Sequence, residues 1–216
     1  MTADLFGAQD DQPWAEHLSA GTVWHHGLAV KHEVQLMTAI ADIERQAGFR
    51  HMVTPGGFRM SAAMTNCGQF GWVTDQGGYR YAESDPQTGK VWPDIPECFL
   101  TLASAAAAQS GYPGFQPDAC LINRYEVGSR MSLHQDKNEQ DFSAPIVSVS
   151  LGLPVQFQFG GLTRKERPAR LTLEHGDVIV WGGPDRLRYH GVGALKSGEH
   201  RLLGACRINL TFRKAG

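Results

Sequence analysis

Residues 206–213 read CRINLTFR and alternate between apolar and polar side chains. Alternation with a period of two is typical of a β-strand, so Ile208, Leu210 and Phe212 share one face. The opposite face carries Arg207, Asn209, Thr211 and Arg213. Two arginines on the inner side of a barrel are costly to bury without anionic partners, and a small dicarboxylate supplies such partners through bidentate pairs. The alternative is a solvated edge strand whose arginines are exposed.

Other short runs of β-forming residues lie between turns, at 119–125, 146–151, 155–159, 170–173 and 177–181. Within the first run, Asn123 and Tyr125 share one face and are placed to bind the same ligand as the two arginines. Six or more short strands without intervening helices favour a sandwich or jelly roll. We find no internal repeat and no low-complexity linker.

A His-x-Asp motif lies in residues 133–136, which read LHQD. If this segment is a strand, residues i and i+2 point to the same face, so His134 and Asp136 can bind one metal ion. His190 follows much later, bounded by turn residues. Two histidines and one carboxylate form a facial triad that leaves positions open on the metal and suits non-haem Fe(II). The alternative is a chance motif with ordinary surface or core histidines.

Size and composition describe a globular chain. The 216 residues are enough for one sizeable domain, and 42% hydrophobic with 19% charged residues excludes a disordered protein. A net charge of -2 gives no overall signal for nucleic acid, so any such contact requires a local patch. Four separate cysteines without a CxxC pair argue against a zinc knuckle or disulfide framework and fit a reducing compartment.

The N-terminal residues carry neither a basic segment nor an apolar segment of the secretory kind, and no apolar run approaches membrane-spanning length. We therefore expect a soluble cytoplasmic protein. Residues 1–22 contain several turn-forming residues and are predicted to be an extended lead-in.

Two helices are expected before the strands. The first spans 30–47, where apolar residues recur at helical spacing. The second is predicted to begin with Asp94 as N-cap, Pro96 in the first turn and Glu97 at the third position, and to end near 109–110. Its small, alanine-rich face should pack closely against a sheet.

Residues 49–93 are rich in aromatic residues, methionines and glycines, and their periodicity is weak. Short strands and hairpins joined by the glycine pairs 56–57 and 77–78 are expected. Aromatic side chains on flexible loops can stack on planar ligands such as bases, whereas a small satellite core is the alternative that this segment alone favours. A basic cluster follows at Arg164, Lys165, Arg167 and Arg170, either as a solvated loop or as a contact to a phosphate backbone.

Several segments together resemble the AlkB family of Fe(II)/2-oxoglutarate-dependent oxidative demethylases. The resemblance covers nearly the whole chain and is weakest in the first thirty or so residues. The segment 116–125 and the Asn-x-Thr-x-Arg ending are its most specific parts. The matching segments are 64–68, 116–125, 133–137, 145–154, 173–178 and 209–213.

The resemblance implies a mainly β fold with flanking helices, in which a double-stranded β-helix (jelly-roll) core lies behind an N-terminal nucleotide-recognition lid. We expect a single domain over 1–216, with the lid at 49–93 and the dioxygenase core at 116–216.

The resemblance also assigns site residues. The catalytic iron ligands are His134, Asp136 and His190. The 2-oxoglutarate contacts are Asn123, Tyr125, Arg207, Asn209 and Arg213. Of the arginines, Arg213 is expected at the distal carboxylate and Arg207 near the carboxylate beside the iron. The substrate contacts are Met64, Trp72, Tyr79, Arg80, Tyr81, Asn138 and Arg164. Asn138 departs from the family pattern, which has Asp there, and this puts the preference among lesions in doubt.

The implied function is oxidative demethylation of N-alkylated bases of the 1-methyladenine and 3-methylcytosine type. The enzyme would bind Fe(II), consume 2-oxoglutarate and O2, and release formaldehyde. The expected partner is alkylated DNA, single-stranded or duplex, with RNA as a further substrate, and the chain is expected to be a monomer. Two alternatives are a 2-oxoglutarate-dependent hydroxylase of a protein or small molecule, and a non-catalytic jelly-roll binding module.

Overall fold

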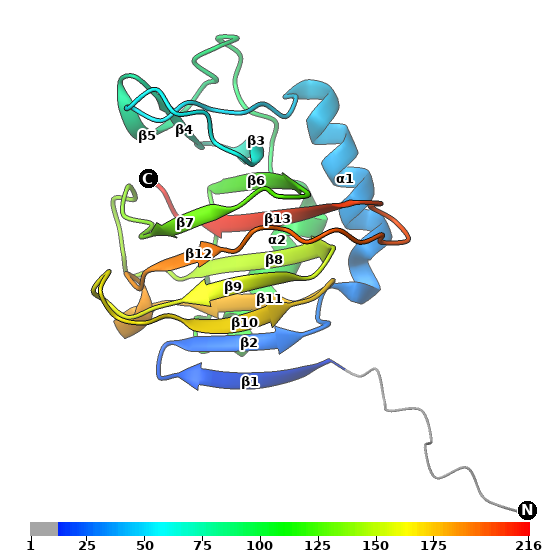
Figure 1. Cartoon of the computed structure of the whole chain (residues 1–216), viewed down its shortest axis with the longest axis vertical. Helices are drawn as coiled ribbons and strands as arrows, with labels where there is room; N and C mark the ends of the chain where they lie inside the picture. The colour runs from blue at the N-terminus through cyan, green and yellow to red at the C-terminus, as the bar shows by residue number, and fades with distance from the viewer. Residues whose placement is uncertain (1–12) are drawn as a thin grey trace, which may run out of the picture.

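The structure is a computed structural model, and it describes residues 13–216. The expectations for residues 1–12 lie outside the described residues. Two antiparallel sheets dominate the chain, and a separate two-stranded ribbon lies beside them (Figure 1). This arrangement, mostly strands with two α-helices, confirms the predicted mainly β jelly-roll fold with flanking helices.

The larger sheet has seven strands and the smaller has four. In spatial order the larger sheet consists of β1 (Trp14–Ser19), β2 (Thr22–His26), β11 (Val178–Trp181), β8 (Ile146–Gly152), β13 (Cys206–Arg213), β6 (Ala119–Glu126) and β3 (Ala63–Gly68). The smaller consists of β10 (Ala169–Leu173), β9 (Val155–Phe159), β12 (His190–Val192) and β7 (Met131–His134). Consecutive strands in sequence often lie in different sheets, as a jelly roll requires.

The predicted lead-in over residues 1–22 was wrong for its described part. β1 and β2 form an antiparallel hairpin, and β2 pairs with β11 at the edge of the larger sheet. Gly21 forms the turn, where a Cβ atom would lie 2.3 Å from the carbonyl oxygen of Gly182. The Gly and Pro residues of this region indicated a loop, but tertiary pairing with β11 overrides that local preference.

The two predicted helices are present. α1 (Glu33–Gln46) follows a short 3-10 turn, η1 (Val30–His32), and α2 (Glu97–Gln109) ends within the predicted limits. The predicted start of α2 was wrong, because Pro96 is the N-cap and no side chain caps the helix. A residue that precedes proline is disfavoured in the helical region, so the helix cannot begin before Pro96. A second 3-10 turn, η2 (Gly183–Asp185), follows β11.

The main core lies between the helices and the outer face of the larger sheet. β13 presents its apolar face there, and Phe212 meets Phe99 of α2 edge to face with ring centroids 5.8 Å apart. The alternation predicted for β13 is therefore confirmed on this face. Each fully buried side chain of this size contributes roughly 1.5–3 kcal/mol to folding.

A second core fills part of the space between the two sheets. Phe157 of the smaller sheet packs on Trp181 of the larger, with ring centroids 6.3 Å apart. The inner face of the larger sheet is nevertheless polar across its middle strands. The buried polar residues there are Asn123, Ser148, Ser150, Arg207, Asn209, Thr211 and Arg213. Buried polar groups are destabilising unless they have hydrogen-bond partners. We call these residues the polar strip, and they indicate a ligand-binding site on the inner face of the larger sheet.

The two-stranded ribbon, β4 (Gly71–Asp75) and β5 (Gly78–Ala82), lies above the barrel in Figure 1. We call residues 71–82 the lid hairpin. A small core lies under it and includes Met52, Val73 and Trp92. Gly71 is required there, because a Cβ atom would lie 2.3 Å from the Trp92 ring. The segment 49–93 also contains β3, which belongs to the larger sheet.

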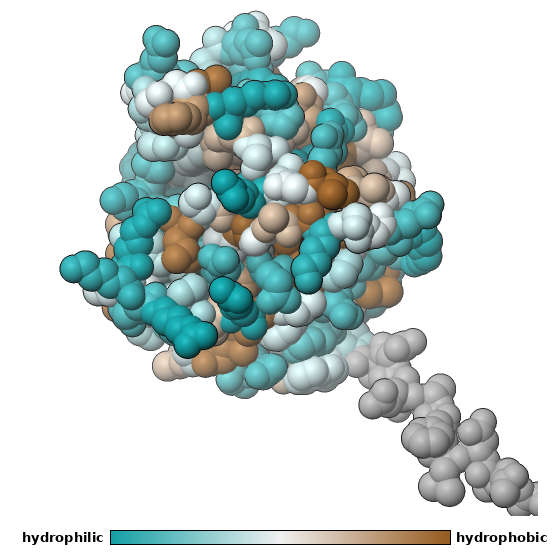
Figure 2. All heavy atoms as spheres, in the orientation of Figure 1, coloured by the Kyte–Doolittle hydropathy of each residue, from teal (hydrophilic) through white to brown (hydrophobic). Residues whose placement is uncertain are grey.

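The visible surface is largely hydrophilic, and Figure 2 shows long hydrophilic side chains projecting over the turn between β9 and β10. Among the described residues, no helix is long and apolar enough to cross a bilayer.

Candidate metal centre

His134, Asp136 and His190 bring their ligand atoms together at the mouth of the barrel, within 4.8 Å of one another. The Nε2 atom of His134 lies 3.6 Å from one oxygen of Asp136, and Nε2 of His190 lies 3.6 Å from the other. The described part of the chain contains no other histidine, cysteine and carboxylate cluster of this kind. Two imidazoles and one carboxylate on one side of a shared point match the facial triad of non-haem Fe(II) sites.

Strand pairing creates this arrangement. His134, the last residue of β7, is the direct register partner of His190, the first residue of β12. The ring centroids lie 4.4 Å apart. The premise that His134 and Asp136 share a strand was wrong, because β7 ends at His134 and Asp136 lies in the following loop. The loop folds the carboxylate back toward the two rings.

Both histidines present the correct nitrogen. Nδ1 of His134 lies 2.9 Å from the carbonyl oxygen of Ser132, and Nδ1 of His190 lies 3.1 Å from that of Arg188. A carbonyl only accepts, so each Nδ1 carries the proton and donates. The lone pair of each Nε2 is then free for a metal, as in most histidine metal sites.

The protonation states also suit a cation. Burial and, second, the neighbouring His190 lower the pKa of His134 to about 4. His134 is therefore neutral at neutral pH. Burial alone would favour protonated Asp136, but Arg213 holds the pKa of this carboxyl well below its usual range. Neutral imidazoles and an ionised carboxylate are the forms that bind metal.

Arg213 contacts the metal-ligand carboxylate of Asp136. Its Nε and Nη2 atoms donate to the same oxygen of Asp136 at 2.9 Å and 2.6 Å. Burial opposes its charge, but the Asp136 carboxylate raises the pKa of Arg213 above its ordinary value. Two of its donors thus already engage the ligand carboxylate in this structure, and the expected contact of Arg213 with the distal carboxylate of 2-oxoglutarate stays a prediction.

Arg207 has the free donors instead. It is 1% exposed, and its Nη2 donates to the Ser150 hydroxyl at 2.9 Å. Its Nε and Nη1 atoms have no hydrogen-bond partner among the described residues. The guanidinium lies 5.2 Å from the Tyr125 ring centroid, and burial lowers its pKa. A buried guanidinium with two open donors fits a carboxylate, so Arg207 remains a candidate to bind 2-oxoglutarate.

The other predicted 2-oxoglutarate contacts surround Arg207. Asn123 is buried on β6 as the register partner of Asn209, and its side-chain oxygen has no partner in the described structure. The Tyr125 hydroxyl makes a weak contact with the sulfur of Met131, at 3.9 Å. Asn209 already has three partners, because it donates to Ser148 and to a backbone carbonyl and accepts from a threonine hydroxyl. Asn123 and Tyr125 can therefore turn to a ligand, whereas Asn209 holds the strip together.

The lid hairpin faces the segment that follows the metal ligands. Trp72 is half-buried and stacks on Tyr79, with ring centroids 5.7 Å apart. Its Nε1 donates to the side-chain oxygen of Asn138 at 3.3 Å. The Tyr81 hydroxyl donates to Glu139 at 2.7 Å. The structure thus brings four of the predicted substrate contacts, Trp72, Tyr79, Tyr81 and Asn138, into one contiguous group beside the metal centre.

Three predicted substrate contacts lie elsewhere. Arg80 pairs with Asp75 inside its own hairpin, with nitrogen–oxygen distances of 2.9 Å and 2.7 Å. Met64 is 1% exposed in the small core under the lid hairpin and therefore has a packing role here. Arg164 is exposed on the turn between β9 and β10.

Glu139 and Arg186 are two site residues that the sequence reasoning missed. Their side chains are 1% and 3% exposed and form an ion pair with 3.1 Å between Nη2 and Oε2. Residue spacing gives no signal for such a pair, because the partners come from separate loops. Glu139 does follow Asp136 closely, and a carboxylate so near a predicted ligand was the available signal.

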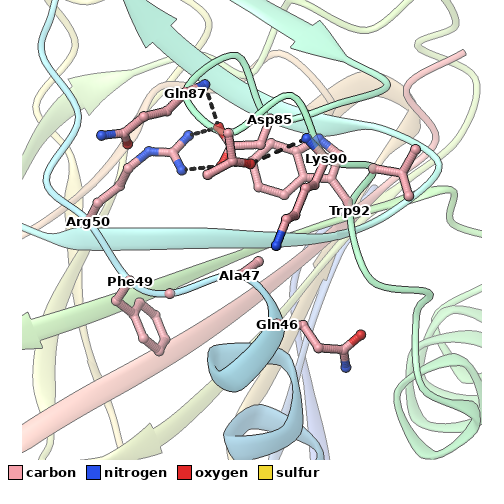
Figure 3. A pocket seen from close by; sticks show the side chains of 11 residues that line it. Gln46, Ala47, Phe49, Arg50, Asp85, Gln87, Lys90 and Trp92 are labelled. Atoms are coloured by element: carbon pink, nitrogen blue, oxygen red, sulfur yellow. Dashed lines mark hydrogen bonds and ion pairs between the residues drawn. The ribbon is translucent and has the colours of Figure 1, made fainter.

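A separate cavity of about 450 Å³ lies beside the end of α1 (Figure 3). Arg50 crosses it to form a bidentate pair with Asp85, both nitrogen–oxygen distances being 2.6 Å. The pair neutralises both charges, and none of the lining residues belongs to the ligand cluster.

Comparison with known proteins agrees with the site. A family model described as the 2OG-Fe(II) oxygenase superfamily matches residues 21–213. The chain is 58% identical over 213 residues to the alpha-ketoglutarate-dependent dioxygenase AlkB of Escherichia coli K12, which spans 99% of this chain and 98% of that protein. It is 34% identical over 122 residues to the nucleic acid dioxygenase ALKBH1 of Mus musculus, which spans 56% of this chain and 31% of that protein.

The solved structure of OsALKBH1 superimposes with a TM-score of 0.80 at 28% identity, and the match covers 93% of this chain and 100% of that one. The prediction of Fe(II), 2-oxoglutarate and O2 as cofactors is confirmed by the superfamily and by the triad. The chain therefore belongs to the AlkB family of alpha-ketoglutarate-dependent (2-oxoglutarate-dependent) dioxygenases, within the 2OG-Fe(II) oxygenase superfamily.

Proposed function

We propose that this dioxygenase demethylates N-alkylated bases of the 1-methyladenine and 3-methylcytosine type in nucleic acid. One observation carries the proposal: the half-buried ring of Trp72 lies in a lid hairpin that contacts the segment directly after the metal ligands. A hydroxylase that acts on a small molecule or a protein needs no aromatic side chain for base stacking beside its metal. Relatives named as AlkB and as a nucleic acid dioxygenase support the same substrate class.

His134, Asp136 and His190 would hold the iron, and Arg207 would bind a carboxylate of 2-oxoglutarate with help from Tyr125 and Asn123. When bound, these cofactors supply O2-dependent hydroxylation of the N-methyl carbon, which then leaves as formaldehyde, while 2-oxoglutarate becomes succinate and CO2. Lone pairs of the two imidazoles and the ionised Asp136 would hold the iron, and the arginines would supply the positive charge that holds 2-oxoglutarate.

A base inside a duplex cannot reach this centre, so the target base must be flipped or already unpaired. An alkylated base that cannot pair normally is easier to extrude, which favours single-stranded DNA and damaged duplex sites. We assign Trp72 as the stacking wall, with His134, whose side chain is 35% exposed, as the opposite wall. Tyr79 and Tyr81 belong to the same pocket, and Asn138 orients Trp72.

Arg164 and the exposed basic residues around it would contact phosphates, since the turn projects from the barrel. Arg80 and Met64 support the hairpin in this scheme rather than touch the base. RNA as a further substrate, a monomeric state and a cytoplasmic location are predictions of the same proposal.

The test is direct. Anaerobic protein loaded with Fe(II) and 2-oxoglutarate is mixed with methylated oligonucleotides in air, and products are read by mass. Loss of one methyl group with stoichiometric formaldehyde supports the proposal. 2-Oxoglutarate consumption that no methylated DNA or RNA stimulates would contradict it and favour a protein or small-molecule substrate. His134→Ala serves as the inactive control.

A further inference from the structure

A second buried carboxylate, Glu139, lies next to the metal ligands and has no role in the scheme above. Its side chain is 1% exposed. One of its oxygens accepts from the Tyr81 hydroxyl at 2.7 Å and lies 3.5 Å from Nε of Arg213. The other oxygen lies 3.1 Å from Nη2 of Arg186. An isolated carboxylate at this depth would be strongly destabilising, so its partners decide its role.

Both arginines that contact Glu139 also contact Asp136. Arg213 donates twice to the Asp136 carboxylate, at 2.9 Å and 2.6 Å. Arg186 donates from Nη1 to the Asp136 backbone carbonyl at 2.9 Å. Two carboxylates and two guanidiniums therefore form one buried network with balanced formal charge. The hydrogen bonds of Arg213 go to Asp136, and Glu139 attracts the same guanidinium from 3.5 Å, so a change at Glu139 must alter how strongly Arg213 is held by Asp136.

The same network reaches the lid hairpin through Tyr81 on β5. Among the described residues, the hairpin makes side-chain hydrogen bonds to the segment 136–140 at two points, Trp72 to Asn138 and Tyr81 to Glu139. The second is shorter and its acceptor is buried. Burial raises the pKa of Tyr81 well above its usual range, so the hydroxyl is a protonated donor. The hairpin is otherwise a two-stranded ribbon separate from both sheets.

We propose that Glu139 is a positioning residue that couples the lid hairpin to the metal-ligand carboxylate. Tyr81 anchors the hairpin to Glu139, and Arg213 links Glu139 to Asp136. By sharing Arg213, Glu139 weakens the hold of that arginine on Asp136 and keeps the ligand carboxylate available to a cation. The inference depends on the proposed function only for the role of the lid hairpin in binding substrate.

Co(II) binding to the full chain tests the coupling without turnover. Glu139→Gln keeps the shape and a hydrogen-bond acceptor for Tyr81 but removes the charge, so Arg213 should pair more strongly with Asp136. We expect Co(II) affinity to fall about tenfold, the lower end of what outer partners of metal ligands contribute. Tyr81→Phe should change the affinity less, because the charge of Glu139 stays.

Hydrogen exchange of residues 71–82, with and without Co(II), gives the second readout. In the wild-type protein Co(II) should slow exchange in the hairpin, and in Tyr81→Phe this slowing should disappear. Tyr112→Phe is the matched control, because it also removes one tyrosine hydroxyl bond, to Gly21 at 2.9 Å, away from the metal centre. It should leave both readouts unchanged.

Wild-type Co(II) affinity in Glu139→Gln, together with intact Co(II)-dependent slowing in Tyr81→Phe, would overturn the inference. If Glu139→Gln fails to fold, hydrogen exchange of residues 71–82 in Tyr81→Phe alone decides whether the hairpin and the metal centre are coupled. Neither readout uses nucleic acid, so coupling without demethylation would reject the proposed function and leave this inference standing.

Discussion

The two faces of β13 differ in their contributions to folding stability and to ligand binding. On the outer face Phe212 and its neighbours lie under α2 and form part of a continuous apolar core. On the inner face Arg207 is equally buried, but two of its donors lack partners among the described residues. The outer face stabilises the fold, whereas the inner face reduces stability and holds a charge ready for a ligand. Residues one position apart thus serve folding and chemistry separately.

The largest expected effect comes from breaking the metal centre. His134→Ala should reduce demethylation to background, because only two protein ligands remain. The side chain is 35% exposed, so the fold should persist. Formaldehyde release and thermal unfolding measure the two effects. His200→Ala, which removes a histidine stacked on His175 with ring centroids 4.4 Å apart, is the control and should keep activity. Full activity in His134→Ala would remove this residue from the ligand set.

The outer face is tested by Phe212→Ala. The side chain is 0% exposed, so its truncation should lower the free energy of unfolding by about 3–5 kcal/mol. Urea unfolding measures this loss. Affinity for 2-oxoglutarate per folded molecule should not change, since the side chain points away from the site. A loss of affinity at unchanged stability would contradict the division between the two faces.

The inner face is tested by Arg207→Met. Binding of 2-oxoglutarate should weaken by about 2–5 kcal/mol, at least about 30-fold, because its carboxylate loses a buried guanidinium. Unfolding free energy should stay constant or rise, since an incompletely paired buried charge is removed. Titration of 2-oxoglutarate into Co(II)-loaded protein measures the first quantity. Arg207→Lys should recover only part of the affinity, because a point charge does not reproduce the planar fork.

Trp72 extends the comparison to the lid hairpin. If its ring stacks on the base, Trp72→Ala should weaken oligonucleotide binding by about 1–3 kcal/mol, and Trp72→Phe should retain much of the affinity. 2-Oxoglutarate turnover without substrate should persist. Melting temperature, uncoupled turnover and oligonucleotide affinity are measured in parallel. A large fall in melting temperature with unchanged affinity per folded molecule would assign Trp72 to the small core instead.

The smallest effect concerns a buried charge whose partners all come from the chain. Burial favours protonated Asp185, but hydrogen bonds from Ser19 and Thr22 and the contact with Arg188 lower its pKa. Its contribution to stability is therefore complete above its unfolded pKa of about 3.9 and is lost as pH falls through the folded value.

Asp185→Asn should accordingly lower the unfolding free energy at pH 7, and the difference from wild type should shrink below about pH 4. Urea unfolding at several pH values measures it. A difference that stays constant down to pH 3 would show that the lost bonds do not depend on the charge.

Local patterns were enough to predict some of this structure. The alternation in β13 identified both its core face and its site face, because the period of a strand is set by neighbouring residues alone. The helix start at Asp94 was wrong because the local rule for Pro96 outweighs the capping preference. The hairpin of β1 and β2 was missed because its link to the larger sheet is the pairing of β2 with β11, which lies far along the chain.

The site could be predicted as a set of residues but not as a geometry. His134, Asp136 and His190 follow from residue type and from resemblance, yet the step that unites them is the pairing of β7 with β12. The contact between Arg213 and Asp136, which leaves Arg207 with the open donors, depends on how β13 meets the loop after β7. Glu139 and Arg186 come from separate loops, and no periodicity relates them.

The register of β7 against β12 makes the metal centre a reporter of correct folding. His134 and His190 face each other as direct partners, and a slip of one residue would turn every side chain of β12 to the opposite face. A compact chain with misaligned strands would keep much of its apolar core but could not hold a cation between these imidazoles. The fraction of a refolded preparation that binds Co(II) therefore counts the molecules with native strand alignment, separately from those that have merely collapsed.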